Sequence, residues 1–179
     1  MARWQNGKME RYCGTRIFPC FHLVMFLFFI SLQCASAQQP MPQPGDTVRG
    51  IFIGDWLQNP PESGEAFHGK PVLLEFWATW CRPCLKAVPH LNELHAEFGE
   101  EVQFIGITQE PPVVAVPVLK KHRMDYAVAS DTEQATTHKI FGTWVIPRTW
   151  ILSPDRVVLW TGHPTRLTKE KLRSILAGN

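Results

Sequence analysis

The sequence predicts an α/β domain built on a mixed central sheet with helices on both faces. Residues 72–77 form an apolar run interrupted by one acid, which is typical of a central strand covered on both sides. Residues 82–98 carry apolar side chains at three- and four-residue spacing, which predicts an amphipathic helix. Residues 102–107 form a second apolar run. A strand, a helix and a strand in this order predict a right-handed parallel crossover.

The first 37 residues predict a secretory signal peptide. A basic segment is followed by an apolar core at 23–30 and then by Ala35-Ser36-Ala37, so cleavage is expected after Ala37. The alternative is a retained N-terminal anchor, for which the apolar run is short against the ~20 residues that span a bilayer. Either outcome predicts a periplasmic or other extracytoplasmic location, with membrane anchoring if the signal is kept.

The part that follows the leader divides into a linker and one domain. Residues 38–47 are rich in proline and glutamine and are expected to form an extended linker, or a flexible arm after cleavage. The domain is expected to span 48–179. Its remaining elements are a weak strand within 48–57, a helix at 114–123 in an insertion (111–123), a strand at 126–129, a helix at 132–141 capped by Ser130 or Asp131, a hairpin of 148–152 and 157–160, and a final helix at 168–176.

The charge of the chain gives no reason to expect nucleic acid as a partner. The formal net charge of +2 reflects 18 basic and 16 acidic residues, of which four basic and one acidic lie in the first 37 positions. From Gln38 onward 14 basic and 15 acidic residues remain, so the domain is nearly neutral.

The cysteines point to redox chemistry rather than to a disulfide scaffold. Three of the five lie in the leader, and only Cys81 and Cys84 lie beyond it. A bridge between such close neighbours closes a very small loop and constrains the unfolded chain little. The pair is therefore expected to be present for its reactivity.

The predicted helix gives the two cysteines different roles. Cys81 stands at its N-terminus, where free backbone N–H groups and the helix dipole favour a thiolate, and Arg82 adds a positive charge. We therefore expect Cys81 to attack. Cys84, about one turn later, is placed to resolve a mixed disulfide, and Pro83 stiffens the first turn without removing a needed donor.

Five sequence features occur together at spacings that are specific in combination. They are Trp80-Cys81-Arg82-Pro83-Cys84, Gly69-Lys70-Pro71 before the strand, Glu75 six residues before Cys81, Pro89 five residues after Cys84, and the segment 142–150 with Ile146-Pro147 before a strand. With them, residues 48–176 resemble the thioredoxin superfamily, and specifically its exported thiol–disulfide oxidoreductases of the TlpA, ResA and DsbE type. The resemblance implies a thioredoxin-like fold.

The resemblance also implies a site and a reaction. The Ile146–Pro147 bond would be cis and lie beside the dithiol, and the backbone of Ile146 would pair with an extended substrate. Independently of the resemblance, Trp80 and Trp144 are candidates to contact the substrate, because exposed aromatic side chains commonly anchor interfaces. The implied reaction is dithiol–disulfide exchange with protein substrates, most simply as a reductant, for example in cytochrome c maturation. No dissociable cofactor is needed, a membrane-bound donor of the DsbD or CcdA type would return electrons, and a monomer is expected.

Glu75 interrupts the apolar strand and carries a further expectation. A carboxylate buried in this strand would have a raised pKa, and it could then take the proton of Cys84 during resolution. The alternative is an acid at a strand end, in contact with water or with Lys70 or Lys86.

Other functions of the dithiol remain open or are disfavoured. A periplasmic oxidant of protein thiols is an alternative, because Arg82-Pro83 does not determine the redox potential. Copper handling by the pair is another, although structural zinc requires four ligands and no second pair exists beyond the leader. A peroxidase site requires Thr-x-x-Cys, whereas Thr79 stands only two positions before Cys81. A domain that only binds would be expected to lack one of the cysteines.

Overall fold

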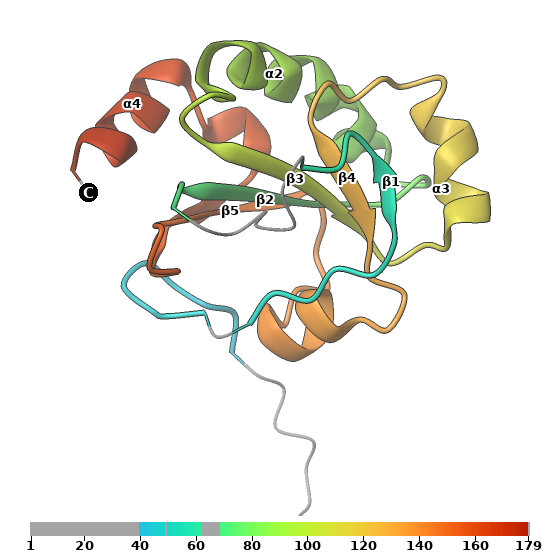
Figure 1. The fold of residues 1–179 in the computed structure, drawn as a ribbon, viewed down its shortest axis with the longest axis horizontal. Coiled ribbons are helices and arrows are strands. Elements are labelled where there is room, and N and C mark those ends of the chain that lie inside the picture. Colours follow the sequence, from blue (N-terminus) through green and yellow to red (C-terminus); the bar gives the residue numbers. More distant parts are fainter. Residues whose placement is uncertain (1–39, 49, 62–68, 179) are drawn as a thin grey trace, which may run out of the picture. The chain divides into compact units, whose positions relative to one another are not determined.

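The computed structural model describes residues 40–48, 50–61 and 69–178, and it contains a six-stranded mixed sheet with helices on both faces (Figure 1). The predicted signal, residues 1–37, lies outside the described residues. The strand order is β1-β4-β3-β2-β5-β6. The strands are β1 (Trp56–Gln58), β2 (Val72–Trp77), β3 (Gln103–Thr108), β4 (Ala127–Ser130), β5 (Arg148–Leu152) and β6 (Val158–Gly162). The helices are α2 (Arg82–Phe98), α3 (Pro112–Leu119), η1 (Ala135–Ile140), η2 (Pro164–Arg166) and α4 (Lys169–Ala177). Within these ranges, every helix is too short or too polar to cross a membrane.

Strand β2 lies inside the sheet because its side chains are suited to burial on both faces. It pairs in parallel with β3 and antiparallel with β5, and all six of its residues are buried. Leu73 and Trp77 belong to one hydrophobic cluster, and Phe76 belongs to the cluster on the other face. Successive side chains of a strand alternate between faces, so Glu75 shares the face of Leu73 and Trp77.

Helix α2 covers that face and brings the dithiol to the end of β2. Its buried residues recur at helical spacing and are Cys84, Ala87, Val88, Leu91, Leu94 and Phe98. Full burial of one such leucine contributes about 1.5–3 kcal/mol. The helix ends before Gly99, whose N–H donates to the carbonyl of His95 over 2.8 Å. Figure 1 shows α4 beside α2 on the same side of the sheet, and Thr168 caps α4 as a side-chain acceptor for the N–H of Lys171.

The opposite face of the sheet carries a cluster of aromatic rings. Phe76 packs edge-on against Trp150 with ring centroids 5.3 Å apart, and Phe141 lies 4.9 Å from Trp150. All three side chains are almost fully buried. Because Phe141 directly follows η1, this cluster fixes η1 on the face opposite α2.

The proline-rich segment 40–47, expected to be a linker, packs against the sheet. The N–H of Gly45 donates to the carbonyl of Val158 over 2.9 Å, and the indole N–H of Trp150 donates to the carbonyl of Pro42 over 3.0 Å. Prolines lack an N–H but keep their carbonyls, so an extended proline-rich strip can still accept hydrogen bonds from a sheet edge. In the described residues this segment is therefore part of the packed unit rather than a free arm.

Three elements differ from the sequence prediction. The helix expected at 114–123 begins two residues earlier and ends four residues earlier, as α3 (Pro112–Leu119). The strand expected within 48–57 is short and late, because only Trp56–Gln58 pairs with β4. The helix expected at 132–141 is a π-helix, Ala135–Ile140, which begins after Gln134 takes the left-handed conformation with φ 56°. Asp131, one of the two predicted caps, holds this start.

Replacement of Asp131 by alanine should destabilise the domain by about 2–4 kcal/mol. Its buried carboxylate accepts hydrogen bonds from the N–H of Ala135 and from both the N–H and the hydroxyl of Thr137, at 2.7–2.9 Å. Alanine would leave these donors unpaired inside the protein. Urea unfolding measures the change, with the exposed Glu133→Ala as the matched control. Equal midpoints for the two variants would contradict the capping role.

Candidate active site

The dithiol lies at the N-terminus of α2, as predicted. Cys81 is the N-cap residue, and the backbone N–H of Cys84 donates to Cys81 Sγ over 3.3 Å. The two cysteines form a disulfide. After reduction, the same N–H groups and the positive end of the helix dipole would favour a thiolate on Cys81, because that sulfur already occupies the capping position.

The dithiol is covered, while the residues around it are exposed. Cys81 and Cys84 are 4% and 2% exposed, whereas Trp80 is 72% exposed. Arg82 and Pro83 also lie at the surface. A partner would therefore contact these three side chains before it reached sulfur.

The second predicted part of the site comes from the loop before β5. The Ile146–Pro147 peptide bond is cis, as the resemblance implied. Pro147 is buried and Ile146 half-buried, and Ile146 lines the same pocket as Trp80. The fold thus brings together two segments more than sixty residues apart in the sequence.

Glu75 is buried and ionises with difficulty. Its side chain is 2% exposed, and its Oε2 accepts a hydrogen bond from the hydroxyl of Thr149 on β5. Burial raises the pKa of Glu75 to about 8, and the hydrogen bond from Thr149 opposes this rise only in part. The alternative of a lysine partner finds no support, because Lys70 donates to the carbonyl of Glu100 and Lys86 is exposed.

Glu110 is a residue of this region that the sequence prediction missed. Its carboxylate accepts the N–H and the hydroxyl of Thr79, each over 2.6 Å, and so anchors the loop that leads into the dithiol. Thr79 is therefore turned toward Glu110. The signal was available, because Glu110 follows β3 as Thr79 follows β2, and the carboxyl ends of neighbouring parallel strands meet at one edge of the sheet.

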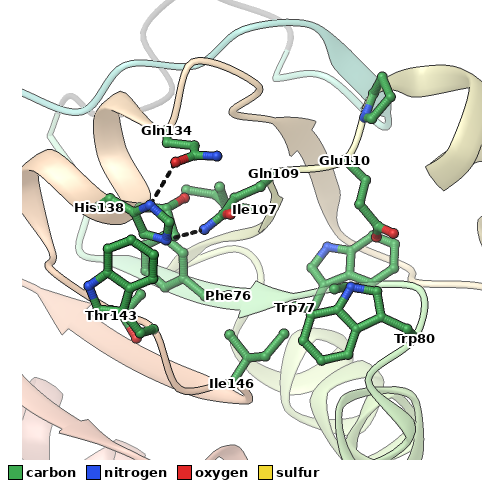
Figure 2. Close-up of a pocket in the computed structure, with 14 residues that line it drawn as sticks. Phe76, Trp77, Trp80, Ile107, Gln109, Glu110, Gln134, His138, Thr143 and Ile146 are labelled. Carbon is green, nitrogen blue, oxygen red and sulfur yellow. Dashed lines mark hydrogen bonds between the residues drawn. The ribbon is translucent and has the colours of Figure 1, made fainter.

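A pocket of about 490 Å³ is lined by Trp80, the residue that directly precedes Cys81 (Figure 2). Figure 2 shows Trp80 and His138 on opposite sides of it, with Ile146 between them. Trp144 is 66% exposed and stacks on the ring of His138 with centroids 3.7 Å apart. The ring of His138 is held by Gln109 and Gln134, each at 2.8 Å, and burial lowers its pKa. The sequence suggested Trp144 as a site residue, but it did not predict that Trp144 stacks on His138 or that Gln109 and Gln134 hold the His138 ring.

One end of the insertion at 111–123 lies at this pocket. Pro111 lines the pocket, and α3 begins at the next residue. Val113, in the first turn of α3, is 79% exposed.

No group of three or more His, Cys, Asp or Glu side chains able to hold a metal ion occurs in the part of the chain that the structure describes.

The sheet order, the dithiol that begins α2 and the cis-proline before β5 define a thioredoxin-like domain. Solved proteins with this fold include two from one species. A secreted disulfide oxidoreductase of Mycobacterium tuberculosis, homologous to DsbE of E. coli, aligns with a TM-score of 0.56 at 21% identity, over 72% of this chain and 96% of that one. The peroxidoxin BcpB of the same species aligns with a TM-score of 0.58 at 23% identity, over 76% and 95%.

Residues 59–161 match the AhpC/TSA family. The chain belongs to this family. It is also 32% identical over 112 residues to the thiol-disulfide oxidoreductase ResA of Bacillus thuringiensis subsp. konkukian, which covers 62% of this chain and 64% of that protein's length. These findings confirm the resemblance to the TlpA, ResA and DsbE type that the sequence predicted.

Proposed function

We propose that this chain is a thiol–disulfide oxidoreductase that acts on proteins outside the cytosol. The observation that carries the proposal is the Cys81–Cys84 pair at the N-terminus of α2, with a buried acid on the same side of the sheet. A curated relative of this chain bears the name of the same activity. The leader pattern supports export, and the redox equivalents reside in the two sulfurs, so no cofactor takes part.

The proposed reaction begins with the reduced protein. The Cys81 thiolate attacks a substrate disulfide, a mixed disulfide forms, and one substrate sulfur leaves as a thiolate. Cys84 then gives its proton to Glu75, and its thiolate attacks Cys81 Sγ. The second substrate sulfur leaves, the substrate is reduced, and the Cys81–Cys84 disulfide remains.

The surface around the dithiol supports a polypeptide as the substrate. Trp80 offers a large exposed apolar surface beside the sulfurs, and exposed aromatic side chains commonly anchor protein contacts. Trp144 provides a second such surface at the pocket. The backbone next to Pro147 would pair with the extended segment that carries the substrate disulfide.

We propose the direction of reduction, as in cytochrome c maturation, with a membrane-bound donor of the DsbD or CcdA type that restores the dithiol. Thioredoxin-fold proteins span potentials from about −270 mV in thioredoxin to about −120 mV in DsbA. The reductant role requires a value near the lower limit. A periplasmic oxidant would lie near the upper one.

Equilibration of the purified protein with glutathione buffers, followed by a count of free thiols, tests the proposal. We expect one two-electron transition at a potential near that of thioredoxin, together with reduction of insulin by the dithiol form. A potential near that of DsbA would instead show that the protein acts as an oxidant of protein thiols. Consumption of hydrogen peroxide with no insulin reduction would instead assign a peroxidase, and copper retained by the reduced protein would favour metal handling. Size-exclusion chromatography checks the expected monomer.

A further inference from the structure

Three buried polar atoms have no hydrogen-bond partner among the side chains that the structure describes. They are Glu75 Oε1, Trp77 Nε1 and Tyr126 Oη. Their side chains are 2%, 2% and 1% exposed, so none is hydrated at the surface. Buried polar groups in native proteins are nearly always paired, and three exceptions in one layer require an explanation.

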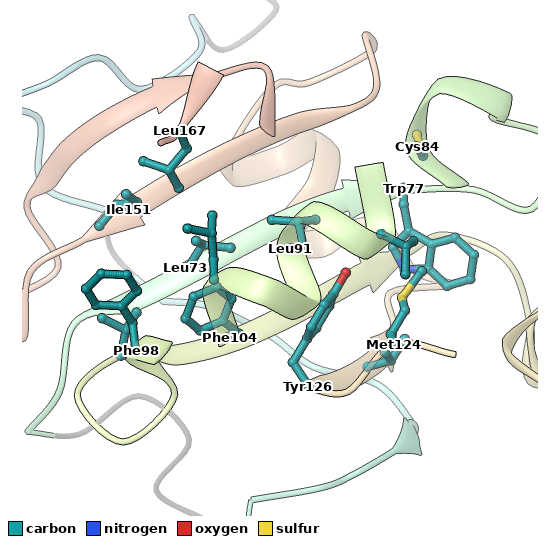
Figure 3. Close-up of a cluster of buried hydrophobic side chains, with 14 of the residues drawn as sticks. Leu73, Trp77, Cys84, Leu91, Phe98, Phe104, Met124, Tyr126, Ile151 and Leu167 are labelled. Atoms are coloured by element: carbon teal, nitrogen blue, oxygen red, sulfur yellow. The ribbon is translucent and has the colours of Figure 1, made fainter. Parts of the chain in front are cut away.

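All three belong to the layer between the sheet and α2. Glu75 and Trp77 lie on the same face of β2, and Trp77 and Tyr126 belong to the hydrophobic cluster that includes Cys84 (Figure 3). Tyr126 directly precedes β4. The group is thus enclosed beneath the helix that carries the dithiol.

A glycine on the neighbouring strand brings these side chains together. Gly106 on β3 is the register partner of Glu75. A Cβ at Gly106 would lie 3.3 Å from Trp77 Nε1 and 3.3 Å from Tyr126 Cε2. The indole N–H and the phenol ring therefore occupy the space that a side chain next to Glu75 would fill.

The hydrogen-bonding capacities of the three groups are complementary. An ionised carboxylate only accepts, an indole N–H only donates, and a phenol can donate. Thr149 already donates to Oε2 of Glu75, so Oε1 is the oxygen that is free to accept. The negative charge of Glu75 also contributes, after burial, to the raised pKa of Tyr126, which places the two groups within electrostatic reach.

We propose that Tyr126 and Trp77 are positioning residues that donate hydrogen bonds to Glu75 Oε1, directly or through one bridging water, whenever that carboxylate is ionised. The inference rests on the proposed function for its consequence. Hydrogen bonds to the ionised form lower a carboxyl pKa, and two donors would keep Glu75 able to accept the Cys84 proton near neutral pH. Each donor would oppose the rise in the pKa of Glu75 that burial causes, and would so increase the fraction of Glu75 that is ionised and able to act as a base near neutral pH.

The phenylalanine variant Tyr126→Phe tests this directly, because it keeps the ring and removes only the donor. The titration of the Glu75 carboxyl is followed by carbon-13 NMR in the oxidised full-length protein. We expect its midpoint to rise by about one pH unit, the usual scale for one hydrogen bond to a buried charge. Thr149→Val, which removes the donor already present, should raise it likewise. Trp160→Phe, a change of aromatic ring on β6, should leave it unmoved.

A second measurement keeps the Tyr126 side chain in place and follows it directly. The chain contains only two tyrosines, Tyr12 in the leader and Tyr126, so incorporation of 3-fluorotyrosine gives two fluorine signals that Tyr12→Phe assigns. The Tyr126 signal should shift with the Glu75 titration in the wild-type chain and should lose this shift in Glu75→Gln. A Tyr126 signal that is flat through the Glu75 midpoint would overturn the inference.

The resolution step supplies the functional readout. The pH at which mixed-disulfide resolution is half-maximal should rise in Tyr126→Phe along with the Glu75 midpoint, and Tyr126→Phe should have no added effect in the Glu75→Gln background. An equal slowing in both backgrounds would show a merely structural role. The titrations require no substrate, so a chain without exchange activity would remove the proposed function alone. An active chain with an unmoved Glu75 titration would remove this inference alone.

Discussion

Serine at position 84 is expected to convert the protein into a trap for its substrates. Cys81 would still attack a substrate disulfide, but the mixed disulfide could no longer be resolved from within the site. An external thiol lacks the effective concentration of a neighbouring thiol, so we expect the adduct to persist at least ~10³-fold longer. Single-turnover mixing with an oxidised protein substrate, quenched with acid and read by mass spectrometry, measures this lifetime.

Cys81→Ser is the matched control, because it makes the same chemical change three residues away. It should form no adduct, since the sulfur at the helix N-cap is then absent. An adduct on Cys84 in that variant would reverse the assigned roles. Normal turnover by Cys84→Ser would show that resolution does not need the second cysteine.

Glu75→Gln is expected to stabilise the oxidised domain at alkaline pH. The pKa of Glu75 is about 8 in the folded protein against an ordinary value of 4.5, so the folded state holds a proton that the unfolded state releases. A raised carboxyl pKa makes folding most favourable below pH 4.5, and the stability then falls as the pH rises toward 8. The full difference of 3.5 pH units corresponds to at most ~5 kcal/mol.

Glutamine has no proton to lose between pH 5 and pH 9. The free energy of unfolding of the variant, relative to that of the wild type, should therefore increase as the pH rises from 5 to 9. Urea unfolding of both proteins across that range gives the difference, and groups that titrate in both proteins cancel from it. Glu133→Gln, which replaces an exposed carboxylate on the segment before η1, serves as the matched control. A difference for Glu75→Gln that stays constant from pH 5 to 9 would mean that Glu75 is ionised throughout.

Much of the fold was predictable because its signals are local. The continuous apolar run of β2, the spacing of buried residues in α2 and the turn between β5 and β6 each depend on residues close in sequence. The elements that were misplaced depend on distant partners. In η1, Thr136 exchanges hydrogen bonds with the backbone of Phe52, 84 residues away, and residues 40–47 are held by β5 and β6.

The candidate site divides in a similar way. From the sequence we predicted Cys81 and Cys84 from their spacing at a helix start, and Glu75 and Pro147 from their positions in the resemblance. The sequence prediction missed Glu110, which follows β3 and hydrogen-bonds to Thr79 after the neighbouring strand β2.

By itself, the sequence determined the chemistry that this protein carries: a dithiol at a helix start and an acid within an apolar strand. Only the tertiary structure decided the surroundings of that acid. Thr149, 74 residues from Glu75 in the chain, donates to its carboxylate, and Gly106, the register partner of Glu75, leaves the space that Trp77 and Tyr126 fill. Sheet register and burial set these contacts, and the same burial moves the pKa of Glu75 toward neutrality. A one-dimensional pattern holds neither the register of neighbouring strands nor the loss of water around a side chain, so these properties arise only when the chain is packed.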